Sequence, residues 1–210
     1  MPILRGNAGR ATDRLEAFSD AIIAIAITLL VLEIHVPERH EEGGSNSKLW
    51  HELGDLWPSY LGFVISFVVI GIMWANHHEI FRYIGRTSHG LITLNTIFLF
   101  CIALAPFPTA LLAEYLRHDG EKTATIVYQG WFLVTAIAYN ILWRYPRKAG
   151  LIAEDADPIA VAEITRRFNF GPPTYLIAFL AAFISPAISL LISAGLAVLY
   201  ALPQRGTSGK

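Results

Sequence analysis

Cysteine and charge are both scarce in this sequence. Its one cysteine, Cys101, lies in an apolar run, which excludes intrachain disulfides, cysteine-rich zinc sites and iron–sulfur clusters. Only 16% of its 210 residues are charged, and 16 Lys and Arg against 17 Asp and Glu give a net charge of −1. The sequence therefore lacks the basic field that binds nucleic acid, and we expect no nucleic-acid partner.

The motifs of catalytic and metal sites are missing as well. The sequence has no phosphate-binding glycine loop, no nucleophile elbow and no paired catalytic carboxylates within one apolar segment. Two neighbouring histidines, His77 and His78, point about 100° apart on a helix and cannot chelate one metal together. We therefore expect no enzymatic activity, no cofactor and no bound metal beyond transiently passing ions.

The sequence is rich in long apolar segments. It is 54% hydrophobic with a mean hydropathy of +0.46, which is typical of a membrane protein. A spanning helix needs about 20 mostly apolar residues. Four stretches without charged residues are long enough to span a membrane, at 56–78, 87–113, 123–143 and 168–204. The last is too long for one helix, and Ser185-Pro186 near its middle predicts a break.

The sequence thus predicts an all-α integral membrane protein with one six-span domain over residues 1–210. The predicted spans are approximately 15–36, 57–81, 89–113, 123–143, 168–184 and 187–203. The longest predicted loops cover about 37–57 and 144–172. We expect the prolines within the apolar segments, Pro106, Pro108, Pro172 and Pro173, to mark kinks or helix starts.

Basic residues predict the orientation. Twelve Lys and Arg fall on the side of the N-terminal tail and four on the other, so both termini are expected in the cytoplasm, with the chain in the cell membrane. The first span could be mistaken for a signal peptide, but Asp20 interrupts it and no small-residue cleavage site follows. On the other side acids outnumber bases, which indicates either ordinary solvated loops or a vestibule that concentrates cations.

The first span contains polar groups that require an explanation, because a central Asp in a membrane helix costs about 2.5 to 3.5 kcal/mol on insertion scales. Ser19 and Asp20 either cap the entry of the helix or anchor it to another helix. Trp74, His77 and His78 lie at the same expected depth on the second span, so they either pack at the interface or bind Ser19 or Asp20. Such a network could make activity sensitive to pH, because histidine titrates near neutrality.

One stripe of the first span is apolar apart from a single hydroxyl. At 100° per residue, the stripe contains Phe18, Ala21, Ile25, Thr28, Leu29 and Leu32. Ordinary helix packing would explain it. If several copies of this helix surrounded an axis, the same side chains would instead form stacked rings, with a hydrophobic constriction and a ring of hydroxyl oxygens.

These residues resemble a known family. The segment from Arg14 to Ala21, with its Arg-x-x-x-Phe-Ser-Asp pattern, closely resembles the first-helix signature of the endolysosomal potassium channel family and its bacterial homologues. The resemblance extends to Leu91-x-x-x-Asn95 and to Pro106-Phe107-x-Thr109-x-Leu111-Leu112 in the third span. Eukaryotic relatives look like two six-helix units in tandem, and this chain has room for one. The resemblance implies a homotetramer in which the first helix of each subunit lines a central pore.

The resemblance also assigns roles to residues of the first helix. The narrowest ring of the family, seven residues beyond the motif phenylalanine, falls on Ile25. Leu29 and Leu32 match further hydrophobic layers, and Thr28 matches a hydroxyl that faces the pore in bacterial members. The four motif residues match positions that look structural, and they are Arg14, Phe18, Ser19 and Asp20.

Two further polar residues each have two alternative roles. Asn95 in the third span is either a packing group bonded across helices or an ion ligand. Glu33 at the far end of the first span either extends into solvent or, in a tetramer, contributes to a ring of carboxylates at the outer mouth.

The expected function is a potassium-permeable cation channel. The sequence has no Thr-Val-Gly-Tyr-Gly loop, so carbonyl cages cannot replace the hydration shell of potassium. A ring of isoleucine compensates little for lost water, so the ion that dehydrates more easily, potassium, should pass preferentially but with modest selectivity over sodium. The same ring could dewet and act as a gate. The alternatives are a proton-coupled or facilitated transporter and a structural protein whose stripe only packs.

Overall fold

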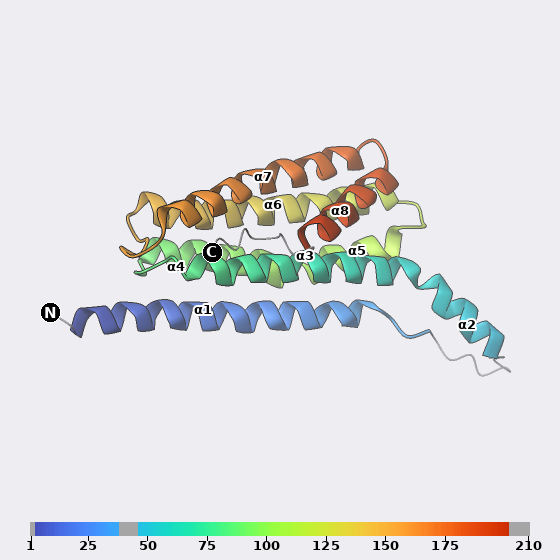
Figure 1. Ribbon diagram of the computed structural model, residues 1–210. Coiled ribbons are helices and arrows are strands. Elements are labelled where there is room, and N and C mark those ends of the chain that lie inside the picture. The colour runs from blue at the N-terminus through green and yellow to red at the C-terminus, as the bar shows by residue number, and fades with distance from the viewer. Residues whose placement is uncertain (1–2, 38–45, 202–210) are drawn as a thin grey trace, which may run out of the picture.

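The described part of the chain, residues 3–37 and 46–201 of a computed structural model, is helical apart from its connections. The elements in order are α1 (Ile3–Leu29), the 3₁₀-helix η1 (Leu30–Glu33), α2 (Asn46–Asp55), α3 (Trp57–Phe81), α4 (His89–Ala103), α5 (Pro106–Tyr115), α6 (Glu121–Lys148), α7 (Pro158–Ala182) and α8 (Pro186–Ala201). Figure 1 shows long helices running side by side, with α1 along one edge of the bundle and α7 along the opposite edge.

Local sequence signals explain where several helices begin. The Ser88 hydroxyl accepts a hydrogen bond from the Leu91 amide, 3.2 Å away, and so caps α4. Asp157 caps α7 in the same way through the Ile159 amide at 2.9 Å. Proline occupies the first position of α5, α7 and α8, where its missing N–H leaves no helical bond unmade.

Four helical segments are long and apolar enough to cross a membrane. They are Ala11–Glu33, Trp57–Phe81, His89–Tyr115 and Glu121–Lys148, and Pro186–Val198 is a shorter apolar helix. The all-α, multi-pass membrane architecture expected from composition is therefore what the structure shows. The exact number of spans stays a prediction, and residues 202–203 of the sixth predicted span lie outside the described residues.

The core of the bundle lies between α3, α4 and α6, and α1 is attached at its edge. The largest fully buried side chains include Trp143, Tyr128, Phe98 and Phe132. In the most apolar stretch of α1 and η1 only 22% of the residues are buried, against 50% for α4–α5 and for α6. One side of α1 packs on α3 and α4, and much of its apolar surface remains uncovered.

Both long predicted loops contain helical residues. The expected loop over 37–57 contains α2, and the expected loop over 144–172 is reduced to residues 149–157, because α6 continues to Lys148 and α7 begins at Pro158. The connection is held by the backbone bridge between Ile84 and Ile152. The predicted third span is interrupted at Leu104–Ala105, where α4 ends and α5 begins at a proline.

Two prolines lie inside α7 rather than at its start. Pro172 has no N–H, so the carbonyl of Phe168, four residues earlier, lacks its helical donor. The Asn140 side chain on α6 donates to this carbonyl over 2.6 Å and replaces the missing bond. Membrane helices tolerate internal proline when a neighbouring group satisfies the freed carbonyl in this way.

This replacement bond predicts a coupling between two substitutions. Asn140→Ala should lower the free energy of unfolding by about 1–2 kcal/mol, because it leaves the Phe168 carbonyl without a donor. In a Pro172→Ala background residue 172 regains its N–H, and Asn140→Ala should then cost less than half as much. Thermal unfolding in detergent measures both losses. Equal losses in the two backgrounds would show that Asn140 acts through other contacts.

Candidate functional site

The uncovered side of α1 and η1 carries a row of bulky apolar side chains. Phe18 is 55% exposed, Ile25 58%, Leu29 40% and Leu32 66%, whereas Ile23 on the packed side is 1% exposed. The row includes Ile25, Leu29 and Leu32, the three bulky residues to which the family resemblance assigns a place in the pore. Lipid or another protein chain must cover a surface of this kind, because such a continuous apolar row is unfavourable in water.

Thr28 contributes the hydroxyl on the same exposed side. Its Oγ1 donates to the Ile25 carbonyl over 2.8 Å, so the hydroxyl hydrogen is held within the helix. Thr28 is exposed, and the remaining lone pairs of its oxygen are free to accept. The hydroxyl therefore offers an acceptor, which suits a cation, and withholds its donor.

The packed side of α1 is held by a buried chain of side-chain hydrogen bonds. Ser19 Oγ donates to the Leu15 carbonyl at 2.8 Å, Asn95 Nδ2 on α4 donates to Ser19 Oγ at 2.8 Å, and His77 Nε2 on α3 lies 2.9 Å from Asn95 Oδ1. Ser19, Asn95 and His77 are each fully buried. The chain joins α1, α4 and α3 at one depth.

The direction of this chain is fixed by counting hydrogens. The Leu15 carbonyl can only accept, so the single hydrogen of Ser19 is used there, and Ser19 must accept from the Asn95 amide nitrogen. Asn95 Oδ1 must then accept from His77, which places a hydrogen on Nε2 and leaves Nδ1 bare in the neutral ring. The buried Nδ1 atom has no hydrogen-bond partner in the described structure.

Aromatic rings hold the His77 imidazole in place. It stacks on Phe81 with ring centroids 4.3 Å apart and lies nearly parallel to Phe98 at 5.8 Å. Phe98 in turn stacks on Tyr139 of α6 at 4.6 Å, and the Tyr139 hydroxyl donates to the Met73 carbonyl of α3 over 3.2 Å. The sequence did not predict these contacts, because no local pattern indicates which rings of different helices meet.

Two further contacts tie α1 to α3 beside this chain. The Trp74 indole donates to Asp20 Oδ1 over 2.9 Å, and His78 Nδ1 lies 2.7 Å from Glu16 Oε1. Of the three second-span residues, Trp74 thus binds Asp20 directly, His77 reaches Ser19 through Asn95, and His78 lies against Glu16 instead. Glu16 was missed, although its place one turn before Asp20 on a helix antiparallel to α3 was a usable signal.

Other motif residues lie away from this network. Arg14 and Phe18 are exposed, and Arg14 has no ion pair within the described segments. Glu33 is half-buried at the end of η1, far along the helix from Ser19. In the described segments no group of three or more His, Cys, Asp or Glu could hold a metal ion.

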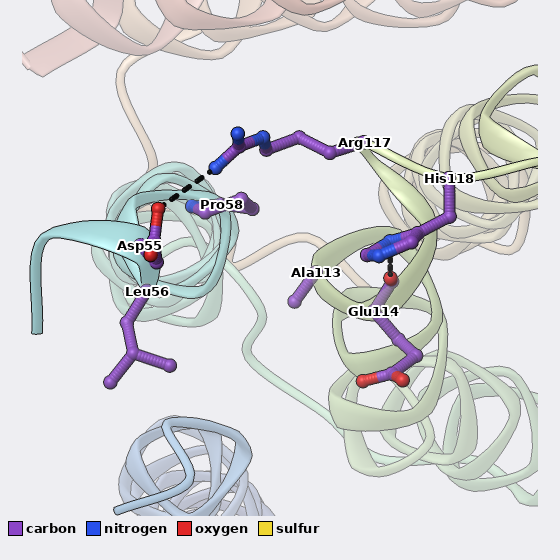
Figure 2. A pocket seen from close by; sticks show the side chains of 7 residues that line it. All are labelled: Asp55, Leu56, Pro58, Ala113, Glu114, Arg117 and His118. Atoms are coloured by element: carbon purple, nitrogen blue, oxygen red, sulfur yellow. Dashed lines mark hydrogen bonds and ion pairs between the residues drawn. The ribbon is translucent and has the colours of Figure 1, made fainter. Parts of the chain in front are cut away.

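A crevice of about 440 Å³ opens at the same end of the bundle as η1. Figure 2 shows it between the α2–α3 junction and the end of α5. Arg117 donates to Asp55 across it at 3.2 Å, and His118 Nδ1 lies 3.0 Å from the Glu114 carbonyl. Its lining residues are Asp55, Leu56, Pro58, Ala113, Glu114, Arg117 and His118. Asp55, one of the acids on the side opposite the N-terminal tail, is therefore paired with a base.

The direction of the hydrogen bonds from His77 to Leu15 predicts the effect of removing the Asn95 side chain between them. Asn95→Ala should lower the free energy of unfolding by about 1–2 kcal/mol, because it leaves His77 Nε2–H without an acceptor in a buried site. Thr96→Ala is the matched control, since the Thr96 hydroxyl bonds only to Ile92 of its own helix, and it should change stability by less than about 0.5 kcal/mol. Unfolding in detergent measures both, and similar losses would contradict the assignment.

Comparison with known proteins identifies the relatives of this chain. Residues 14–106 match the family described as endosomal/lysosomal potassium channel TMEM175. A potassium channel of Chamaesiphon minutus is 47% identical over 91% of this chain and 94% of its own length. A potassium channel of Streptomyces collinus is 42% identical over 91% of this chain and 92% of its own. The TMEM175 proton channel of Gallus gallus is 36% identical, over 54% of this chain and 24% of its own length.

Solved structures support the same relationship. The crystal structure of a lysosomal potassium-selective channel TMEM175 homolog from Chamaesiphon minutus has a TM-score of 0.80 and 44% identity, over 92% of this chain and 97% of that chain. The potassium channel MtTMEM175 shares the fold, with a TM-score of 0.58 at 24% identity, over 90% of this chain and 88% of that chain. All of these relatives are described as ion channels rather than enzymes. The resemblance seen in the first-span motif is confirmed, and the chain belongs to the TMEM175 family.

Proposed function

We propose that this chain forms a potassium-permeable cation channel in which α1 of four identical subunits lines a central pore. The observation that carries the proposal is the apolar row on the uncovered side of α1 and η1, opposite the side that the polar chain fixes. A helix anchored on one face and apolar on the other presents four copies of the row to a common axis when the symmetry closes. In this arrangement the chain spans the cell membrane six times, with both termini in the cytoplasm.

Ile25 is the proposed constriction, with Leu29 and Leu32 as further layers. Hydrocarbon side chains offer no ligand to an ion, so passage requires partial loss of its water. Potassium loses water more easily than sodium and crosses with the smaller barrier, which gives a modest preference. Thr28, whose exposed hydroxyl oxygen keeps lone pairs free to accept, offsets part of the dehydration cost. Glu33 contributes a ring of carboxylates at the mouth.

The descriptions of the relatives support potassium as the permeating ion. Two proteins that match nearly the whole chain at 47% and 42% identity are described as potassium channels. The structure with a TM-score of 0.80 is described as potassium-selective. Arg14, Phe18, Ser19 and Asp20 belong to the proposed frame of the pore, and Trp74, His77, His78 and Asn95 brace it.

The polar chain itself gives little support to proton-coupled transport, the alternative function. Each hydrogen in it points toward α1, and the chain ends on the Leu15 carbonyl, which can accept but cannot pass a proton on. Potassium flux that requires a proton gradient in liposomes would nevertheless favour a transporter over a channel.

The constriction predicts a change in selectivity. Ile25→Asn should raise sodium flux through reconstituted channels by about tenfold, which corresponds to about 1.4 kcal/mol of barrier, because an amide replaces part of the lost water. Ile177→Asn is the matched control, since Ile177 on α7 is exposed to nearly the same extent, 57% against 58%. Paired sodium and potassium flux assays in proteoliposomes measure the ratio. Unchanged selectivity in Ile25→Asn would remove this residue from the filter.

The Thr28 hydroxyl predicts a smaller effect. Thr28→Val keeps the shape of the side chain and removes the acceptor, so the potassium-to-sodium flux ratio should fall about two- to tenfold, the range expected for one net hydrogen bond of about 0.5–1.5 kcal/mol. Thr28→Ser retains the hydroxyl and should preserve the ratio. An unchanged ratio in Thr28→Val, or an equal fall in Thr28→Ser, would show that the hydroxyl oxygen is not the determinant.

A further inference from the structure

The end of α1 changes its winding before the chain leaves the bundle. After Leu29 the helix continues as the 3₁₀ turn η1, in which the Ile34 amide donates to the Val31 carbonyl over 3.1 Å. Leu29 has φ −66° and ψ −25°, which already lies in the 3₁₀ range. The tighter winding therefore begins at one of the apolar residues of the proposed pore.

This change decides where Leu32 points. A 3₁₀-helix turns about 120° per residue, so residues three apart eclipse, whereas in an α-helix they lie about 60° apart. Leu32 therefore stands on the same side as Leu29, about 6 Å further along the axis. Leu29 and Leu32 are both exposed, at 40% and 66%, as is Val31 at 51%, whereas Leu30 is fully buried against the bundle. The winding stacks two leucine layers that an α-helix would stagger.

The surface behind η1 is formed by α3 and α5. Both helices contact η1, and Leu30 belongs to the same buried core as Ile65 of α3 and Leu112 of α5. Gly62 of α3 lies beside Thr109 of α5, since a Cβ at Gly62 would be in ordinary van der Waals contact with Thr109 Cγ2, 3.5 Å away. The separation of α3 and α5 thus sets the site that receives Leu30.

A buried chain of hydroxyls fixes that separation. Thr109 Oγ1 donates to the Ala105 carbonyl at 2.9 Å, where α5 begins, and Ser66 Oγ of α3 lies 2.8 Å from Thr109 Oγ1. The Tyr128 hydroxyl of α6 lies 3.0 Å from Ser66 Oγ. Because Thr109 has used its hydrogen, Ser66 must donate to Thr109 and Tyr128 to Ser66. All three side chains are at most 1% exposed.

We propose that Ser66 and Thr109 are positioning residues for the outer leucine layer of the pore. They hold α5 against α3, and through the site for Leu30 they keep η1 in its 3₁₀ form, with Leu32 in register over Leu29. Both residues are buried and neither belongs to the exposed row on α1 and η1. The inference rests on the proposed channel function and adds a determinant of it outside the pore helix and its motif.

Cysteine accessibility tests this inference in the assembled channel. In a Cys101→Ala background, Leu32→Cys and Leu29→Cys are each combined with Ser66→Ala, and a soluble cationic thiol reagent is added on the η1 side while potassium flux is recorded. Ser66→Ala should slow modification at position 32 by about fivefold or more, because thiol reaction rates follow access to the sulfur. The rate at position 29 should stay unchanged. Thr109→Val, which keeps the side-chain shape, should reproduce the result.

Three controls separate positioning from general loosening. Ser189→Ala removes an equally buried hydroxyl between α8 and α7, where Ser189 Oγ donates to the Ala178 carbonyl at 2.7 Å, and should leave position 32 unaffected. Tyr128→Phe preserves the Ser66–Thr109 bond and should also have little effect. Ser66→Thr retains the hydroxyl and should restore the rate.

The outcomes distinguish this inference from the channel proposal. Equal slowing at positions 29 and 32, an equal effect of Ser189→Ala, or no change with Ser66→Ala and Thr109→Val would each overturn the positioning role while leaving the pore intact. If reagent on cysteines at positions 25, 29 and 32 never reduces flux, the pore assignment itself is wrong, and the inference falls with it.

Discussion

The arrangement of this protein depends on a short chain of hydrogen bonds that runs from His77 through Asn95 and Ser19 to the Leu15 carbonyl. It attaches one face of α1 to α3 and α4, and the contacts of Asp20 with Trp74 and Glu16 with His78 lie beside it. With that face fixed, the apolar row of α1 must point away from the subunit. In a channel built from four such subunits, this attachment would direct the apolar row of each α1 toward the central axis.

Side-chain hydrogen bonds accompany two of the helix irregularities, one in α7 and one between α4 and α5. Asn140 bonds the carbonyl that Pro172 frees in α7, and the Tyr128–Ser66–Thr109 chain ends on Ala105, where α4 gives way to α5. In a membrane a free backbone carbonyl costs more than in water, because no solvent can bond it. In α7 the Asn140 side chain on the neighbouring helix α6 therefore bonds the freed carbonyl and joins the two helices.

The sequence by itself determined the helical membrane fold and the surface on which function is proposed. Long charge-free segments allow little except spanning helices, and Pro106 and Pro186 stand where α5 and α8 begin. The stripe that includes Ile25, Leu29 and Leu32 follows from helical periodicity alone, and the motif around Ser19 and Asp20 was sufficient for the family. These features are local, so residue type and spacing specify them.

Only the tertiary structure decided how the helices bind one another. The pairing of Glu16 with His78, the hydrogen on His77 Nε2 and the stack of His77 on Phe98 each depend on which side chains of different helices meet. The bond from Asn140 to the Phe168 carbonyl that Pro172 frees likewise joins residues 28 apart in the chain, and it depends on how α6 packs on α7. Distances between helices settle all of these contacts, and no single segment encodes such a distance.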